Sequence, residues 1–246
     1  MTSIEKQLKD TQKELTDLKE EYQEFVYATS HDLSAVFRVI EGFSQIIAMD
    51  HEGTLDKETK LHFEFITKSV KKGKEIQESL LELSRLTTRA DPFSRVDSNE
   101  LVNEATESLT ELIQSKKAHI EFSDLPLVIA DRQQMTLLFF HLIQNALIYQ
   151  AENSQPHIVI SAKEKDHCWE FSVKDNGMGI QGTQTEKIFK VLGRSVGDEY
   201  PGIGMGLAIV KKVLQRHRGN IWVKAVKDAG TIFYFTLAKQ LRGPSE

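Results

Sequence analysis

The first fifty residues contain no proline and repeat mostly apolar side chains at alternating spacings of four and three residues. This spacing predicts a long helix with a coiled-coil seam. Around Thr29 two four-residue steps follow one another, forming a stutter that locally unwinds a left-handed supercoil, and His31 lies inside it. The seam consists of Ile4, Leu8, Thr11, Leu15, Leu18, Tyr22, Phe25 and Thr29, continued by Leu33, Val36, Ile40, Phe43 and Ile47.

A second amphipathic helix is expected after a turn at residues 50–56. Two long helices that each carry one apolar stripe cannot bury both stripes by themselves. We therefore expect an α-helical hairpin that pairs with a second copy to form a dimeric four-helix bundle. The second stripe consists of Leu61, Phe65, Ile66, Val70, Ile76, Leu80 and Leu83.

The helical pattern breaks at Pro92, where we place the start of a second domain. Two of its expected helices open with capping boxes, formed by Asp97 with Glu100 and by Asp131 with Gln134. The order of elements predicts an α/β domain in which helices cover one face of a sheet. Helices are expected at about 98–115, 132–150 and 204–217, and strands at 157–162, 169–174, 220–226 and 231–237.

Composition excludes several classes of protein. The formal net charge of -5 and the sequence pI of about 5.9 argue against nucleic acid as the main partner. A single cysteine rules out a disulfide framework or a thiolate metal site within one chain. No apolar run approaches the roughly twenty residues that span a bilayer, and the N-terminus lacks the apolar segment of a signal peptide. We therefore expect a cytoplasmic protein.

Two glycine-rich segments accompany the expected elements of the second domain. Residues 175–180 (DNGMGI) end an apolar strand, where glycines admit a ligand and a buried carboxylate accepts from an exocyclic amine. Taken alone, this segment fits a tight turn equally well. Residues 202–207 (GIGMGL) open a helix whose free backbone N–H groups suit phosphates. They lack the preceding strand of a dinucleotide-binding unit, so alone they are a weak signal.

Two polar side chains lie on the expected helices. Asn145 occupies an apolar helix, where a hydrogen bond between packed helices is the simpler interpretation of that residue alone. His31 precedes Leu33 by two residues, roughly 200° around the helix, and therefore points away from the seam. An exposed imidazole beside Asp32 suits nucleophilic attack, because the carboxylate holds the proton of one ring nitrogen and leaves the other lone pair available.

Together these segments resemble the GHKL ATPase fold, and specifically the catalytic domain of histidine kinases, over residues 97–239. QMTLLFFHLIQNALIY resembles the N box, VKDNGMGI the first glycine box, EKIF the F box, and YPGIGMGLAIVKKVLQRHRGNIWV the second glycine box. FVYATSHDLSAVFRVIEGFSQI resembles the H box of the dimerisation and phosphoacceptor domain. The SHDL core and the DEYPGIGMGLAIVKK stretch look most like the phytochrome-type branch.

The resemblance implies a protein-histidine kinase that phosphorylates His31 from Mg-ATP, with Asp32 and Arg194 as further catalytic residues. Arg194 matches a family arginine that reaches the γ-phosphate and stabilises the transition state of phosphoryl transfer. Asp175 is implied to accept from the adenine amine, with Tyr149 near the ring. The resemblance further implies Asn145 as the Mg²⁺ ligand, Gly202, Gly204 and Gly206 as the phosphate cradle, and Gly177, Gly179, Ile180 and Leu207 as other nucleotide contacts.

The chain departs from the family pattern at several positions. Val36 replaces the usual H-box proline, so the helix keeps a hydrogen bond and kinks less. His141 stands where a first asparagine is usual, and Ile148 stands where a lysine often contacts phosphate. Loss of that cation lowers the expected affinity or rate, unless Arg194 or Lys187 compensates for it.

The sequence thus predicts a coiled-coil signalling helix at 1–24, a dimerisation and histidine phosphotransfer domain at 25–90, and an ATP-binding α/β two-layer sandwich at 97–240. Expected partners are a second copy of the chain, a response-regulator receiver domain, and an upstream sensor domain or sensor protein. One alternative is a degenerate relative that acts as a dimeric phosphotransfer or scaffold module with little ATP-dependent activity. Another is a different GHKL ATPase, such as a serine-directed anti-sigma kinase or a chaperone-type ATPase, although the H box argues against it.

Ala35 predicts weak or absent phosphatase activity toward a phosphorylated response regulator. The position four residues after His31 often carries Thr, Asn or Gln for dephosphorylation, and alanine cannot orient a water molecule. The measurement is the loss of phosphate from the phosphorylated regulator with and without this protein. Rapid hydrolysis that depends on the protein contradicts the prediction.

Overall fold

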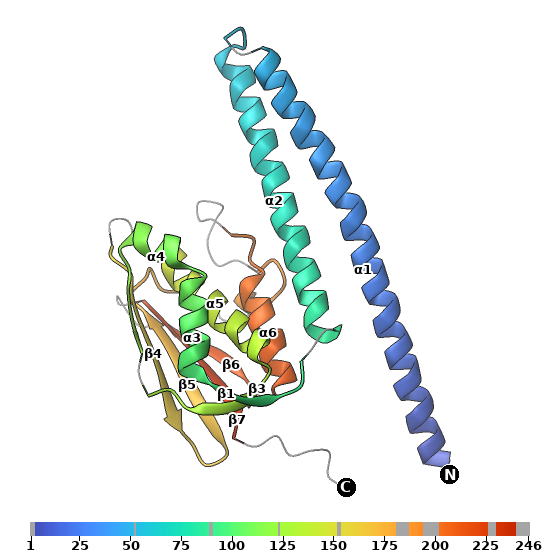
Figure 1. Ribbon diagram of the computed structural model, residues 1–246, viewed down its shortest axis with the longest axis vertical. Coiled ribbons are helices and arrows are strands. Elements are labelled where there is room, and N and C mark those ends of the chain that lie inside the picture. The colour runs from blue at the N-terminus through green and yellow to red at the C-terminus, as the bar shows by residue number, and fades with distance from the viewer. Residues whose placement is uncertain are drawn as a thin grey trace. The chain divides into compact units, whose positions relative to one another are not determined.

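The chain divides into two compact units, residues 1–88 and residues 89–246, which are drawn in Figure 1. The first is a helical hairpin and the second is an α/β domain, so the predicted order of a helical hairpin followed by an α/β domain is confirmed. Among the described helices, none combines the length and the hydropathy that a bilayer span requires. The computed structural model describes residues 3–51, 53–88, 91–122, 124–151, 154–180, 187–193, 202–225 and 230–239.

The hairpin consists of helix α1 (Ser3–Asp50) and helix α2 (Lys57–Thr88), joined by a short turn. The two helices approach closely at Gly73, where a Cβ atom would lie 2.5 Å from Cζ of Phe37. Next to this contact, Lys74 forms an ion pair with Glu41. The absence of a side chain at Gly73 therefore makes room for the aromatic ring of the facing helix.

The predicted seam is not the face on which α1 packs against α2. Leu33 is 41% exposed and Phe43 is 63% exposed, whereas Ser30 and Ser44 are buried. The stripe of α2 is uncovered in part, because Phe65 is 58% exposed whereas Val70 is buried. A single hairpin therefore packs a face of α1 that carries Ser30, Phe37 and Ser44, and leaves the seam of α1 and part of the α2 stripe at its surface.

The second unit contains a five-stranded sheet with strand order β2-β4-β5-β7-β6, and a separate two-stranded sheet of β1 and β3. Strand β2 runs parallel to β4, and the other neighbours are antiparallel. Helices α5 and α6 pack against one face of the larger sheet, and α3 packs beside α5 (Figure 1). The elements are β1 (Ser94–Asp97), α3 (Ser98–Glu107), α4 (Thr110–Lys116), β2 (His119–Phe122), β3 (Leu127–Ala130), α5 (Arg132–Ile148), β4 (His157–Glu164), β5 (Cys168–Asp175), η2 (Lys187–Phe189), α6 (Gly206–Arg216), β6 (Ile221–Ala225) and β7 (Thr231–Ala238).

Three phenylalanines fill the centre of this domain. Phe171 of β5 and Phe235 of β7 are stacked at a centroid distance of 4.8 Å, and Phe139 of α5 contacts both rings edge-on. All three side chains are fully buried. Offset and edge-to-face contacts of this kind stabilise aromatic pairs beyond their area burial by about 0.5–1.5 kcal/mol, so they fix α5 over the middle of the sheet.

The structure corrects the expectation of one helix at 98–115. It contains two helices, α3 and α4, separated at Ser108 and Leu109. The capping box at Asp97 is also wrong in part, because Asp97 accepts from the backbone N–H of Asn99, and Glu100 pairs with Arg132 at 2.9 Å. The second cap is present: the Asp131 side chain accepts from the Gln134 backbone N–H at 3.1 Å.

Asp131 is the centre of a buried polar network that joins three segments of the domain. Its carboxylate accepts from the Arg216 guanidinium at 2.8 Å and from the Asp91 backbone N–H at 2.9 Å. Its own backbone N–H donates to Nε2 of His217 at 3.1 Å, while Nδ1 of His217 lies 2.8 Å from the Val213 carbonyl. The ring is therefore a neutral tautomer with its proton on Nδ1, and burial lowers the pKa of His217 below its ordinary value.

The close approach of α1 and α2 generates a prediction with a matched control. A Gly73→Ala change places a methyl group against Phe37, and we expect the resulting overpacking to reduce the free energy of unfolding by about 1–3 kcal/mol. Gly42→Ala meets no atom within 4 Å, so it should raise stability by up to about 1 kcal/mol through helix propensity. Denaturant unfolding followed by helical circular dichroism measures both. Equal effects of the two changes would show that Gly73 has no packing role.

Candidate nucleotide and phosphoacceptor sites

Asp175 ends β5 and is almost completely buried, with 5% of its surface exposed. Its Oδ1 atom accepts from the backbone N–H of Gly177 at 2.8 Å and of Thr231 at 3.1 Å. Burial raises the pKa of the carboxyl group to about 6, and the two backbone donors oppose that rise only in part. The structure therefore holds an oriented acceptor at the end of a central strand.

Glycines are required on both sides of this carboxyl group because backbone atoms lie too close for a side chain. A Cβ atom at Gly177 would lie 2.3 Å from the carbonyl oxygen of Tyr149. At Gly230, which has a φ of +96°, it would lie 2.1 Å from the backbone oxygen of Asp175. The backbone N–H of Met178 donates to the same Tyr149 oxygen at 3.1 Å, which ties the first glycine segment to the end of α5.

The second glycine segment, residues 202–207, also lies close to α5 and to Tyr149 at its end. Gly202 and Gly204 have φ angles of +117° and +75°, in the left-handed region that favours glycine. The hydroxyl of Tyr149 lies 3.9 Å from the Cβ position of Gly202. At the first residue of α6, the Cβ position of Gly206 is 3.0 Å from Nδ1 of His141. His141 of α5 and Tyr149, the residue that follows α5, thus both lie close to this segment.

Asn145 lies one turn before Tyr149 on α5, and its backbone carbonyl accepts from the Tyr149 backbone N–H at 3.0 Å. The residue is half-buried, and its side-chain amide forms no hydrogen bond with the residues that the structure describes. A hydrogen bond from Asn145 to a packed helix, the simpler interpretation of this residue taken alone, is therefore not found among the described residues. Ile180 and Leu207, two further predicted contacts, are also half-buried, as is Gly179 with its φ of +75°.

The segment between the two glycine boxes is described only at residues 187–193. Ile188 of the F-box resemblance is buried, and Phe189 contacts Phe233 edge-on at a centroid distance of 6.5 Å. Lys187 is exposed. The predicted catalytic residue Arg194 lies outside the described residues.

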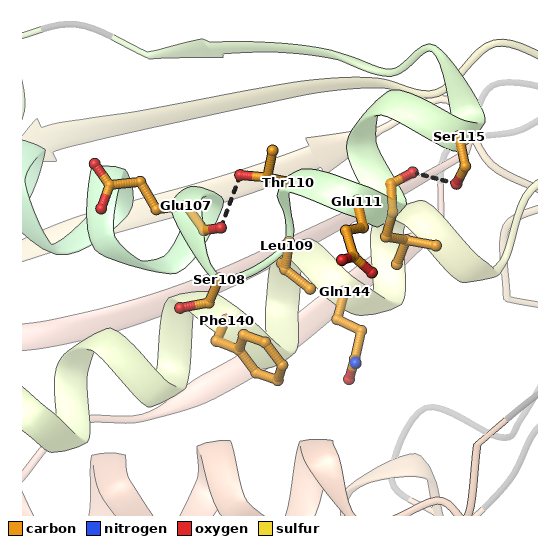
Figure 2. A pocket seen from close by; sticks show the side chains of 9 residues that line it. Glu107, Ser108, Leu109, Thr110, Glu111, Ser115, Phe140 and Gln144 are labelled. Carbon is orange, nitrogen blue, oxygen red and sulfur yellow. Dashed lines mark hydrogen bonds between the residues drawn. The ribbon is translucent and has the colours of Figure 1, made fainter.

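A surface groove of about 840 Å³ lies elsewhere on the same domain, between α5 and the break that separates α3 from α4. Figure 2 shows Phe140 and Gln144 of α5 on one side of it and Leu109 and Glu111 on the other. None of the predicted nucleotide contacts that the structure describes lines this groove. It is therefore distinct from the arrangement around Asp175.

His31 lies on α1 with its side chain 75% exposed. Its Nδ1 atom is 3.4 Å from Oδ1 of Asp32, longer than an ordinary hydrogen bond. Next to His31 along the chain and about 60–100° around the helix from it, the Ser30 carbonyl and the Ser34 hydroxyl accept from the buried Gln77 amide of α2. Polar contacts to α2 therefore hold the helix on both sides of His31 while the imidazole remains open to solvent.

Three residues of the nucleotide region, Gly230, Thr231 and His141, were not predicted as site residues from the sequence. Gly230 and Thr231 approach Asp175 from the start of β7, and the glycine before an apolar strand was the available signal. His141 was treated only as a departure from the N box, but it lies against the first residue of α6. His141 precedes Asn145 by four residues and so lies on the same face of α5, which was the available signal that it belongs to this region.

Comparison with known proteins agrees with this geometry. Residues 130–241 match the family model of histidine kinase-, DNA gyrase B- and HSP90-like ATPases. Over 218 residues, 88% of this chain, the sequence is 34% identical to cyanobacterial phytochrome A of Nostoc sp.. The chain spans 28% of the length of that relative.

Two solved structures share the fold. Full-length ShkA in complex with AMPPNP has a TM-score of 0.63 and 21% identity, and the match covers 90% of this chain and 47% of that one. The histidine kinase ThkA in complex with the response regulator protein TrrA has a TM-score of 0.61 and 22% identity, covering 93% of this chain and 66% of that one.

The α/β unit is thus an ATP-binding domain of the histidine kinase, gyrase and HSP90 type. Together with the preceding hairpin, it gives the chain the sequence and the fold of a sensor histidine kinase transmitter core of the phytochrome kind, as its motifs predicted.

The raised pKa of Asp175 generates a pH prediction. Protonation favours the folded state, so this contribution is fully present below pH 3.8 and is lost as the pH rises through about 6. We expect Asp175→Asn, which stays neutral and can still accept from Gly177 and Thr231, to gain up to about 3 kcal/mol relative to the unchanged protein between pH 4 and pH 7. Urea unfolding at both pH values gives the difference. Parallel pH profiles for the two proteins would contradict a raised pKa.

Proposed function

We propose that this chain phosphorylates its own His31 from Mg-ATP and transfers the phosphoryl group to an aspartate of a response-regulator receiver domain. One observation supports this most strongly. The end of α5, the first glycine segment and the second glycine segment meet around Tyr149, directly beside the buried carboxyl group of Asp175. An exposed histidine in a preceding hairpin supplies the phosphoacceptor.

The nucleotide would bind with its adenine toward Asp175. Oδ1 of that residue is already held by two backbone donors, so the carboxyl group is fixed in position to accept from an exocyclic amine. The glycines at 202 and 204 allow the backbone to reach close to phosphate oxygens, and the N–H groups at the start of α6 provide an anion site. Tyr149 lies between these two regions and would pack near the adenine ring.

Asn145 fits the role of a Mg²⁺ ligand. Its half-buried amide has no hydrogen bond within the described residues, and its oxygen is a hard ligand of the kind that Mg²⁺ takes alongside water and phosphates. The ion would neutralise phosphate charge during transfer. Among the described residues, we assign the Asn145 side-chain oxygen as the ligand, and helix α5 sets its position.

At the phosphoacceptor, Asp32 lies on the Nδ1 side of His31, so we assign the attacking lone pair to Nε2. A bond forms between Nε2 and the γ-phosphorus as the bond from that phosphorus to the bridging oxygen breaks, and ADP leaves. The proton on Nδ1 then belongs to a positively charged ring. Asp32 is positioned to stabilise that charge and to accept the proton.

The uncovered apolar stripes support a homodimer. In a single hairpin the side chains of the predicted seam remain at the surface, and a second hairpin would bury them in a four-helix bundle. His31 points away from those stripes, so dimer formation would leave it accessible to a receiver domain. Input would come from a sensor domain or a separate sensor protein.

Incubation of the full chain with labelled ATP and magnesium tests the proposal. We expect acid-labile phosphate on the unchanged protein and its loss in His31→Gln. Asn145→Ala should lower the rate at least about tenfold, which corresponds to about 1.4 kcal/mol of the barrier. His62→Gln is the matched control, because it removes another exposed histidine of the same hairpin and should have no effect.

The outcomes separate the proposed kinase from the degenerate module. Label that depends on both His31 and Asn145 supports the kinase. Phosphate taken from a phosphorylated regulator without any ATP-dependent labelling supports the phosphotransfer module. Labelling that persists in His31→Gln would show that the phosphoacceptor has been assigned to the wrong residue.

A further inference from the structure

Two histidines and a glutamate converge at the edge of the five-stranded sheet, away from the residues that surround Asp175. Nε2 of His119 lies 3.0 Å from Oε1 of Glu121, and Nε2 of His157 lies 2.9 Å from the same oxygen. The two imidazole rings are stacked with their centroids 5.5 Å apart. One ligand atom from each residue lies within 4.8 Å of the other two.

The strand register places these side chains on one face. His119 of β2 and His157 of β4 are direct partners in a parallel pair, and Glu121 follows His119 by two residues. All three are exposed, whereas Ile158 and Ile160, on the other face of β4, are buried under the helices. Because β2 is the edge strand, the cluster opens both to the uncovered face and to the side of the sheet.

We propose that His119, Glu121 and His157 form a binding site for a divalent transition-metal ion of the zinc type. Two neutral imidazoles and one carboxylate are a ligand set that zinc takes in proteins, with a water molecule in the fourth position. Imidazole also favours zinc, nickel and copper over magnesium. The site is therefore selective against the ion expected at Asn145.

The geometry suits a metal better than a simple ion pair. The Glu121 side chain is 52% exposed and those of His119 and His157 are 66% and 46% exposed, and contacts at such exposure contribute little to stability. Both Nε2 atoms nevertheless point to one oxygen. A divalent ion among these three atoms would attract the Glu121 carboxylate in place of the two ring N–H groups, and each Nε2 would then offer its lone pair to the ion. The three ligand atoms already lie within 4.8 Å of one another, so rotation of these exposed side chains would bring them to zinc–ligand distances of about 2.0–2.1 Å.

The site is connected to the first glycine segment through the start of β4. The backbone N–H of His157 donates to Oδ1 of Asn176 at 2.8 Å, and Nδ2 of Asn176 donates to the Gln155 carbonyl at 2.9 Å. Asn176 lies between Asp175 and Gly177. A metal that fixes the edge of β2 against β4 therefore also fixes the strand end that supports this loop.

The test is a calorimetric titration of the full chain with Zn²⁺ in buffer that contains millimolar Mg²⁺. We expect one zinc ion per chain, without competition from magnesium. His119→Ala, His157→Ala and Glu121→Gln should each weaken zinc binding by at least about 10–100-fold. Loss of a residue that only hydrogen-bonds to a metal ligand already has an effect of that size. His167→Ala is the matched control, because it removes an exposed histidine outside the cluster and should leave the affinity unchanged.

Two measurements keep the outcome clear. Melting temperatures in a chelator show that each variant remains folded, and added zinc should raise the melting temperature of the unchanged protein and of His167→Ala only. Failure of the unchanged protein to bind zinc at micromolar concentration overturns the proposal. Equal binding by the three cluster variants also overturns it, because the ion would then be held elsewhere.

Discussion

The buried carboxylate of Asp131 joins helices α5 and α6, which carry the proposed nucleotide site of the ATP-binding domain. It caps α5, receives the Arg216 guanidinium at the end of α6, and accepts from the backbone at Asp91. Removal of one partner from a buried charge of this kind typically costs about 3–5 kcal/mol, since the other is left uncompensated. Because α5 carries Asn145 and α6 begins with Gly206, the network at the opposite ends of these helices fixes the distance between the proposed metal ligand and the phosphate cradle.

The long elements were predictable because their periodic patterns extend over many residues. Helices α1, α2, α5 and α6 and the four longer strand segments were all identified from the sequence. Strands β1, β2 and β3 were missed, since each has four residues and so short a segment shows no periodicity. The break between α3 and α4 was missed as well. The seam was recognised, but a repeat along one helix does not say which face its hairpin partner will cover, and here the partner covers the small polar face.

The nucleotide region shows a similar division. Asp175 and the glycines stand in short contiguous motifs, so their residue types and spacing were visible in the sequence. The Thr231 donor comes from a strand 56 residues further along, and only antiparallel pairing of β5 with β7 brings it to the carboxyl group. The effect of burial on the pKa of Asp175 was also invisible, because it depends on the three-dimensional surroundings of the side chain. The histidine pair at the sheet edge could not be recognised from the sequence for the same reason, because 38 positions separate His119 from His157, and only the parallel pairing of β2 with β4 makes them neighbours.

The amide of Gln77 on α2 opposes sliding or rotation of α1 against α2. It reaches two acceptors of α1, the Ser30 carbonyl and the Ser34 hydroxyl, which lie on consecutive turns beside His31. If α1 slid or rotated by a fraction of a turn, this buried amide would lose both acceptors, at a cost of about 1–3 kcal/mol. Any movement of α1 past α2 at His31 therefore has to break and remake these two hydrogen bonds.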